Sequence, residues 1–145
     1  MKNSTIFSSI IGFIGAFFTA LFGGWTTGMI TLLIFMGIDY LSGLVVAGVF
    51  QKSNKSESGA LESRAGFKGL CRKCMILLFV LIAYRLDLMI GTNYIRDAVV
   101  ITFSINEVLS IAENAALMGI PLPKVILKAL DILKQKASFE EGNNG

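Results

Sequence analysis

Residues 25–50 read WTTGMITLLIFMGIDYLSGLVVAGVF, a nearly unbroken apolar run that decides the class of fold. A helix needs about 20 apolar residues to cross a hydrocarbon core of ~30 Å, so this run is long enough even when it is tilted. Trp25 stands at its start, where aromatic side chains commonly anchor a helix at the membrane interface. The run predicts a membrane-spanning helix with one charged residue, Asp39, inside it.

Three further apolar runs lie at residues 6–22, 74–90 and 95–118. The whole chain of 145 residues is 54% hydrophobic and only 16% charged, whereas soluble domains carry about 25% charged residues. We therefore expect an all-α integral membrane protein with about four transmembrane helices. The first run could instead be a secretory signal, but its small residues fit a cleavage site poorly, which favours a retained helix.

The polar segments lie between and after these runs. Residues 51–73 are expected to form a charged loop, and Gly119, Pro121 and Pro123 to end the fourth helix. Residues 120–137 are expected to form an amphipathic helix that either lies on the anionic leaflet or bundles with its copies, and residues 138–145 a disordered tail. Most Lys and Arg residues fall in the N-terminus, the loop and the C-terminal segment, so the positive-inside rule predicts that both termini are cytoplasmic.

The composition argues against several classes of function. The chain contains no histidine, the commonest general base and metal ligand, so we expect no enzyme. The single pair Cys71 and Cys74 cannot complete a four-ligand zinc site within one chain, so we expect two free thiols, no metal and no cofactor. A net charge of +3 is too small to indicate binding of nucleic acid.

Three ionisable residues are expected near the middle of the membrane. Asp39, Arg85 and Glu107 each lie about 11 residues from the expected cytoplasmic end of their run, which corresponds to a depth of ~16 Å. Each costs at least ~2.5 kcal/mol there, so it needs a partner or water. Two acids and one base at one depth could pair, either to line a polar path or to hold helices together. Asp87 is expected nearer the outer interface.

Two helix faces suggest association. Polar residues spaced four, four and three apart form one face of the fourth run, which either lines a pore in an assembly or packs against the other spans. These residues are Thr102, Asn106, Ser110 and Glu113. Small residues at every fourth position near the N-terminus would let two helix backbones approach closely, between protomers or within one chain. They are Gly12, Ala16, Ala20, Gly24 and Gly28.

Three segments together resemble the bacteriophage holin family of the toxin-secretion/phage-lysis type. They are residues 37–50, GIDYLSGLVVAGVF; residues 66–87, GFKGLCRKCMILLFVLIAYRLD; and residues 106–130, NEVLSIAENAALMGIPLPKVILKAL. The positions that match the family motifs are Asp39, Glu107, Ser110, Glu113, Asn114, Gly119, Pro121 and Pro123. Arg85 has no counterpart in these motifs.

The resemblance implies a holin, which accumulates in the host cytoplasmic membrane and assembles into homo-oligomeric lesions. It also implies a functional partner, a cell-wall hydrolase (endolysin) or a toxin that leaves through the lesion. The residues alone leave open a small ion channel or transporter of fixed stoichiometry, or a membrane scaffold that recruits a partner through the polar loop. A transporter would be expected to show inverted repeats, and none is visible between residues 6–50 and 74–118.

Overall fold

The computed structural model describes residues 2–142, and these residues form helices without any strand. The helices are α1 (Lys2–Phe22), α2 (Thr27–Val45), α3 (Ser63–Ile90), α4 (Ile95–Leu117) and α5 (Lys124–Gly142). A π-helical turn, Val46–Phe50, extends α2. The prediction of an all-α protein is confirmed.

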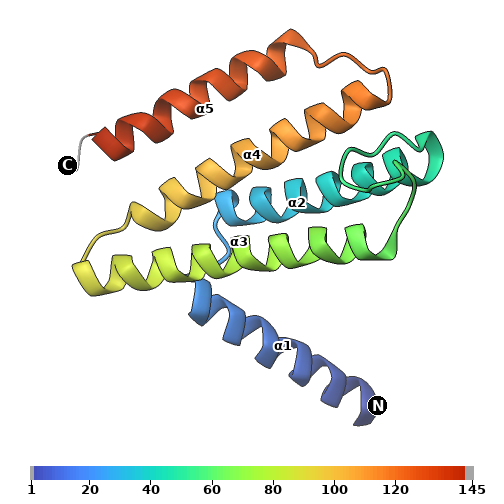
Figure 1. The fold of residues 1–145 in the computed structure, drawn as a ribbon. Coiled ribbons are helices and arrows are strands. Elements are labelled where there is room, and N and C mark those ends of the chain that lie inside the picture. The colour runs from blue at the N-terminus through green and yellow to red at the C-terminus, as the bar shows by residue number, and fades with distance from the viewer. Residues whose placement is uncertain (1, 143–145) are drawn as a thin grey trace.

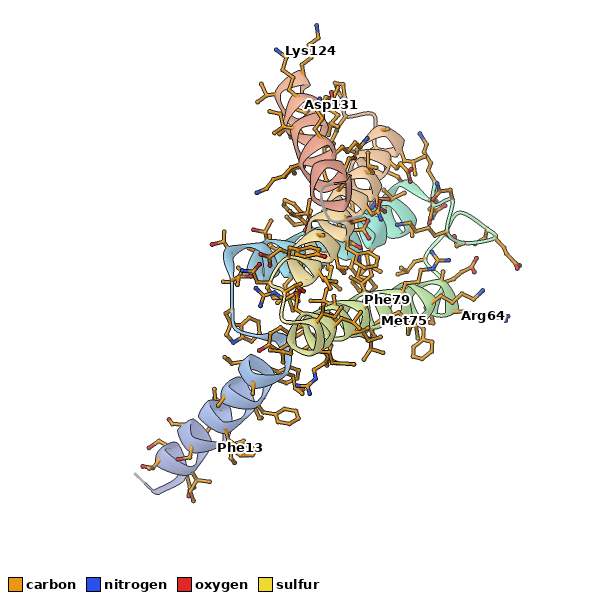
Figure 2. The ribbon with its side chains drawn as sticks, turned by 90° about the vertical axis from the view of Figure 1, so that its left-hand side faces the viewer. Phe13, Arg64, Met75, Phe79, Lys124 and Asp131 are labelled. Atoms are coloured by element: carbon orange, nitrogen blue, oxygen red, sulfur yellow. The ribbon has the colours of Figure 1, made fainter. Side chains whose placement is uncertain are left out.

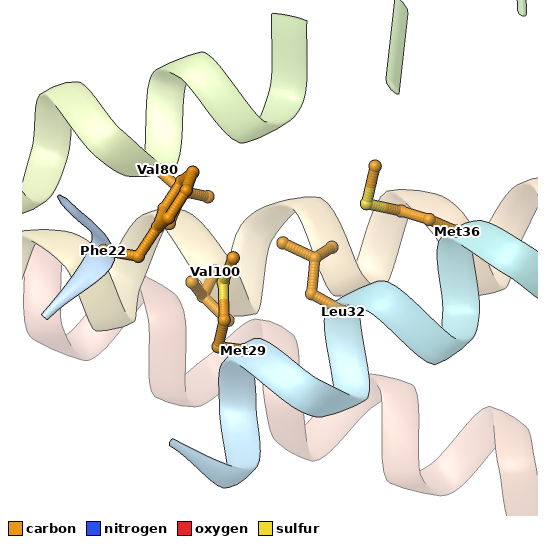
Figure 3. Close-up of a cluster of buried hydrophobic side chains, with 6 residues drawn as sticks. All are labelled: Phe22, Met29, Leu32, Met36, Val80 and Val100. Carbon is orange, nitrogen blue, oxygen red and sulfur yellow. The ribbon is translucent and has the colours of Figure 1, made fainter. Parts of the chain in front are cut away.

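Helices α2, α3 and α4 pack side by side, with the largest interface between α2 and α4 (Figure 1). Helix α5 folds back along α4, and α1 points away from the other helices (Figure 1). A cluster of buried apolar side chains joins α2, α3, α4 and the end of α1 (Figure 3). Its members are Phe22, Met29, Leu32, Met36, Val80 and Val100.

Two segments within residues 2–142 are long and apolar enough to cross a membrane, Asn3–Phe22 and Thr27–Phe50. They correspond to the first two expected spans. Helices α3 and α4 carry more charged side chains, because α3 includes a basic first half and α4 includes Arg96, Asp97, Glu107 and Glu113. The count of four spans therefore stays a prediction.

Two polar segments are more helical than expected. Helix α3 begins at Ser63, so the expected loop 51–73 shortens to residues 51–62. Lys and Arg are good helix formers, and hydropathy does not distinguish a polar helical turn from a loop. Helix α5 continues to Gly142, so residues 138–142 of the expected tail are helical in the structure, and no proline or glycine interrupts the helix before that point. Residues 143–145 of the expected tail lie outside the described residues.

Helix α1 ends at a turn that Arg96 holds in place. Gly23 and Gly24 have left-handed φ angles of 77° and 101°. The Arg96 guanidinium donates hydrogen bonds of 3.0 Å to the carbonyls of Phe22 and Gly23, which satisfies acceptors that the helix end leaves open. The same guanidinium lies 5.7 Å from the centre of the Tyr84 ring.

This turn divides the row of small residues. Gly24 lies in the turn and Gly28 in α2, so these two residues do not continue the face formed by Gly12, Ala16 and Ala20 as expected. The part of the row on α1 is largely exposed, and α1 contacts α3 rather than α2. Of the two alternatives for this row, packing of the first span against the second within one chain is not the arrangement in the structure, and association between protomers stays a prediction.

We predict that Gly23→Ala destabilises the protein more than Gly91→Ala. A Cβ at Gly23 would lie 2.3 Å from the Tyr84 ring, whereas Gly91, with a nearly equal φ of 78°, has nothing within 4 Å. Both substitutions place a side chain in the left-handed region at a cost of about 1–2 kcal/mol, and only Gly23→Ala adds the clash. The midpoint of thermal unfolding in detergent measures both. The difference in stability between the two variants should disappear in a Tyr84→Ala background. Equal losses of stability in the two variants with Tyr84 present would contradict the prediction.

Candidate functional site

Lys73 on α3 joins a carboxylate of α2 to a carboxylate of α4. Its ammonium donates a hydrogen bond of 2.7 Å to Asp39 Oδ2 and a second hydrogen bond to Glu107 Oε2. The three side chains are 12%, 9% and 7% exposed for Lys73, Asp39 and Glu107. A buried charge is tolerated when it is paired and hydrogen-bonded, as these three are. The Lys73 ammonium therefore connects α2, α3 and α4.

A second cation reaches Asp39 from residues 51–62, which we call the cap loop. The ammonium of Lys55 lies 3.6 Å from Asp39 Oδ1 and donates a hydrogen bond of 3.0 Å to Ser110 Oγ. Its side chain is 37% exposed, so this contact stands at the edge of the buried region. Asp39, Lys55, Lys73 and Glu107, which we call the ionic network, contain two positive and two negative charges and balance one another.

Asn114 on α4 fixes the position of Asp39. Its amide nitrogen donates to Asp39 Oδ1 at 3.2 Å and to Ser42 Oγ at 2.9 Å, and the residue is only 2% exposed. These bonds set the register of α2 against α4 at the level of the ionic network.

The cap loop closes over a cavity of about 220 Å³ that the ionic network lines, together with Tyr40, Arg72 and Ser110. The loop holds its own shape: the Ser53 amide donates to the Gly59 carbonyl at 2.9 Å. Gly59 has a φ of 75°, and a Cβ there would lie 2.7 Å from the Gln51 carbonyl oxygen, so glycine is required. At the end of the loop, a hydrogen bond from the Ser58 hydroxyl holds the pKa of Glu62 below its usual value.

The structure brings some of the expected site residues together and separates others. Asp39, Glu107 and Ser110 meet, whereas Arg85 is exposed elsewhere on α3 and the pairing expected of it is not found. The remaining polar residues of the α4 face do not enter the network. Thr102, Asn106 and Glu113 are exposed, and the Thr102 hydroxyl donates to the Ala98 carbonyl at 2.9 Å.

Sequence reasoning missed both lysines of the network because they were assigned to a cytoplasmic loop. Lys73 lies ten residues inside α3, about 15 Å from the first turn of that helix. A signal was present: Gly66, Gly69 and Lys73 recur at helical spacing and place one narrow face of this segment toward α2. Lys55 had no comparable signal, since only the folded loop carries it to Ser110.

Asp87 has a structural role at the opposite end of α3. Its carboxylate accepts hydrogen bonds from the backbone amides of Ile95 and Arg96, at 3.0 and 2.9 Å, and from the Thr92 hydroxyl at 2.7 Å. It therefore caps the first turn of α4. No group of three or more His, Cys, Asp and Glu side chains in the described part of the chain is placed to hold a metal ion.

Comparisons with known proteins identify one family. The profile of the bacteriophage holin family matches residues 16–135. The chain is 40% identical to the uncharacterized protein Lin0175 of Listeria innocua over 91% of this chain and 89% of that protein. It is 37% identical to a 14.9 kDa protein in the nagH 3′ region of Clostridium perfringens, over 85% of this chain and 89% of that protein. A protein described as a probable holin, from Bacillus phage phi105, is 31% identical over 71% of each chain. No solved structure matches significantly.

We predict that Lys73→Met destabilises the protein by about 3 kcal/mol, because it leaves two buried carboxylates without their shared cation. Lys68→Met is the matched control, since Lys68 lies on the same helix, is exposed and has no ion pair among the described residues. The free energy of unfolding in a neutral detergent measures both variants. Adding Glu107→Gln to Lys73→Met should recover part of the loss, and equal losses in the two lysine variants would contradict the prediction.

Proposed function

The chain belongs to the bacteriophage holin family, and we propose that it acts as a holin. In this proposal, copies of the chain accumulate in the cytoplasmic membrane of a bacterial host and assemble into lesions. An endolysin or a toxin then leaves the cytoplasm through them, and the host lyses. The proposal rests on the family and on one structural observation, the ionic network. The buried charges of this network are neutralised within one protomer only while the cap loop holds Lys55 beside Asp39.

We propose that α1 to α4 cross the membrane and that the cap loop and both termini are cytoplasmic. Support comes from the outer surface of the bundle. Ile30, Ile34, Ile38, Leu41 and Val45 form a continuous exposed row along α2, which would be costly in water and is suited to lipid. The π-helical turn continues this row with exposed Val49 and Phe50.

The exposed polar face of α4 supplies the reason to assemble. Thr102, Asn106 and Glu113 lie on the surface of a single protomer, where lipid would otherwise contact them. Polar groups in hydrocarbon favour contact with other polar groups or with water, and several copies arranged around an aqueous space provide both. We infer that this face lines the lesion.

Opening of the ionic network accompanies assembly in this mechanism. When the cap loop moves aside, Lys55 leaves Asp39, and Asp39, Lys73 and Glu107 then carry one uncompensated negative charge. That charge is stable only if water reaches it. Depolarisation can bias such a step, since a potential of 100 mV is worth ~2.3 kcal/mol for each charge moved fully across the membrane.

A small ion channel of fixed stoichiometry is the second candidate, favoured by the cavity that the ionic network lines beneath the cap loop. Particle sizing in mild detergent separates the two functions. A single small oligomer supports the channel, whereas large and heterogeneous assemblies support the holin. A scaffold that only recruits a partner would not release dye from loaded liposomes.

We predict that Asp39→Ala and Glu107→Ala shift the time of lysis or abolish it while the protein still inserts into the membrane. Each substitution removes one carboxylate and leaves excess positive charge in the network. The test is induction in bacteria that co-express an endolysin, with viability, membrane potential and released hydrolase followed over time. If the unsubstituted chain leaves the potential unchanged and releases no hydrolase, the proposed function is wrong. If both variants lyse cells on the normal schedule, the network has only a packing role.

We also predict that Lys55→Ala advances lysis, because the cap loop loses its contacts with Asp39 and Ser110. Lys52→Ala is the matched control: it removes one lysine from the same loop, and Lys52 is exposed with no side-chain partner in residues 2–142. The time from induction to loss of culture density measures the effect at equal protein levels. Identical lysis times for the two variants would show that Lys55 does not hold the loop closed.

A further inference from the structure

One exposed face of α3 changes from basic to apolar within two turns. Its residues recur at intervals of three and four, which places them in one row along the helix. From the first turn onward they are Arg64, Lys68, Cys71, Met75, Phe79, Ile82 and Leu86. Arg64, Met75 and Phe79 follow one another along this helix in Figure 2. The apolar members are between 39% and 50% exposed, so residues 2–142 cover this row only in part.

The opposite side of the same helix is already occupied. Gly66 and Gly69 face the ring of Tyr40, and Lys73 reaches Asp39 and Glu107. Lys73 is therefore used inside the bundle, whereas Arg64 and Lys68 are directed outward.

The outward cations have no anionic partner within the described residues. Arg64 and Lys68 border a shallow polar hollow together with Glu57 and Glu62, but neither forms an ion pair with these acids. Glu62 is instead hydrogen-bonded by Ser58. Two cations are thus free on the surface, one helical turn apart, directly before an apolar row.

We propose that Arg64 and Lys68 bind the phosphate groups of anionic phospholipids in the leaflet that covers this end of the bundle. The inference rests on the proposed membrane location, and it adds a lipid class that the protein recognises and a level at which the bundle sits. Clusters of Lys and Arg next to a membrane-spanning helix attract anionic headgroups. Phe67, which is 67% exposed, lies beside them and would enter the interface with its apolar ring.

This contact also fixes the depth of the ionic network. Lys73 follows Lys68 by five residues, about 8 Å along the helix axis. The network therefore lies close below the headgroups rather than at the membrane midplane that residue counting indicated. At that depth, movement of the cap loop alone brings water to Asp39 and Glu107.

Cys71 offers a reporter at this boundary, since it lies between Lys68 and Met75 on the same exposed face. A fluorophore on Cys71 in a Cys74→Ser variant is placed in phosphatidylcholine vesicles that contain a small fraction of headgroup spin-labelled lipid. We expect spin-labelled phosphatidylglycerol to quench the fluorophore about threefold more than spin-labelled phosphatidylcholine does. The preference should fall as salt concentration rises.

In the variant Arg64→Gln/Lys68→Gln, both spin-labelled lipids should quench the fluorophore equally. Lys134→Gln/Lys136→Gln is the matched control, because it removes two exposed charges from α5 and should keep the preference. Equal quenching by the two lipids in the chain with Arg64 and Lys68 intact would overturn the inference. The inference would also be overturned if the α5 variant lost the preference as fully as the Arg64→Gln/Lys68→Gln variant, because overall charge would then explain the effect. A preserved preference in a chain that forms no lesions would defeat the proposed function alone, whereas normal lesions without a preference would defeat this inference alone.

Discussion

Two carboxylates inside an apolar helix bundle must share cations, and Lys73 meets that requirement. Its contacts with Asp39 and Glu107 connect α2, α3 and α4 at one point and fix their relative positions. The other local features follow from this contact. Asn114 holds the Asp39 carboxylate in place, and the start of α3 at Ser63 places Lys73 within the bundle instead of in a loop.

In the proposed function, the same contact explains how one chain can be stable alone and still prepared to assemble. Lys73 balances only one of the two acids, and the second cation comes from Lys55 on a loop that closes over the cavity. Charge balance therefore depends on a segment that can leave without unfolding a helix. Removing one partner of a buried ion pair is strongly unfavourable, so loss of Lys55 favours entry of water or new contacts with other protomers.

The sequence predicted the helices well and the network only in part. Long apolar runs gave the four main helices, and residue counting placed Asp39 and Glu107 at one level. It named Arg85 as the cation, because Arg85 lies inside an apolar run and Lys73 lies at its edge. Depth alone could not decide between them, since the choice depends on the direction in which each side chain leaves α3. The row of small residues is interrupted for a similar reason: the periodicity continues through Gly24 and Gly28 in the sequence, but the left-handed turn at Gly23 redirects the chain.

Mass-spectrometric footprinting of carboxylates tests the central claim most directly. A carbodiimide with an amine label modifies carboxylates that water reaches, and Asp131, which is exposed on α5, serves as the internal reference. In dispersed protomers, Asp39 and Glu107 should be protected relative to Asp131. In membranes where the chain has assembled and leakage has begun, both should become labelled. Leaking membranes in which Asp39 and Glu107 stay protected would contradict the account.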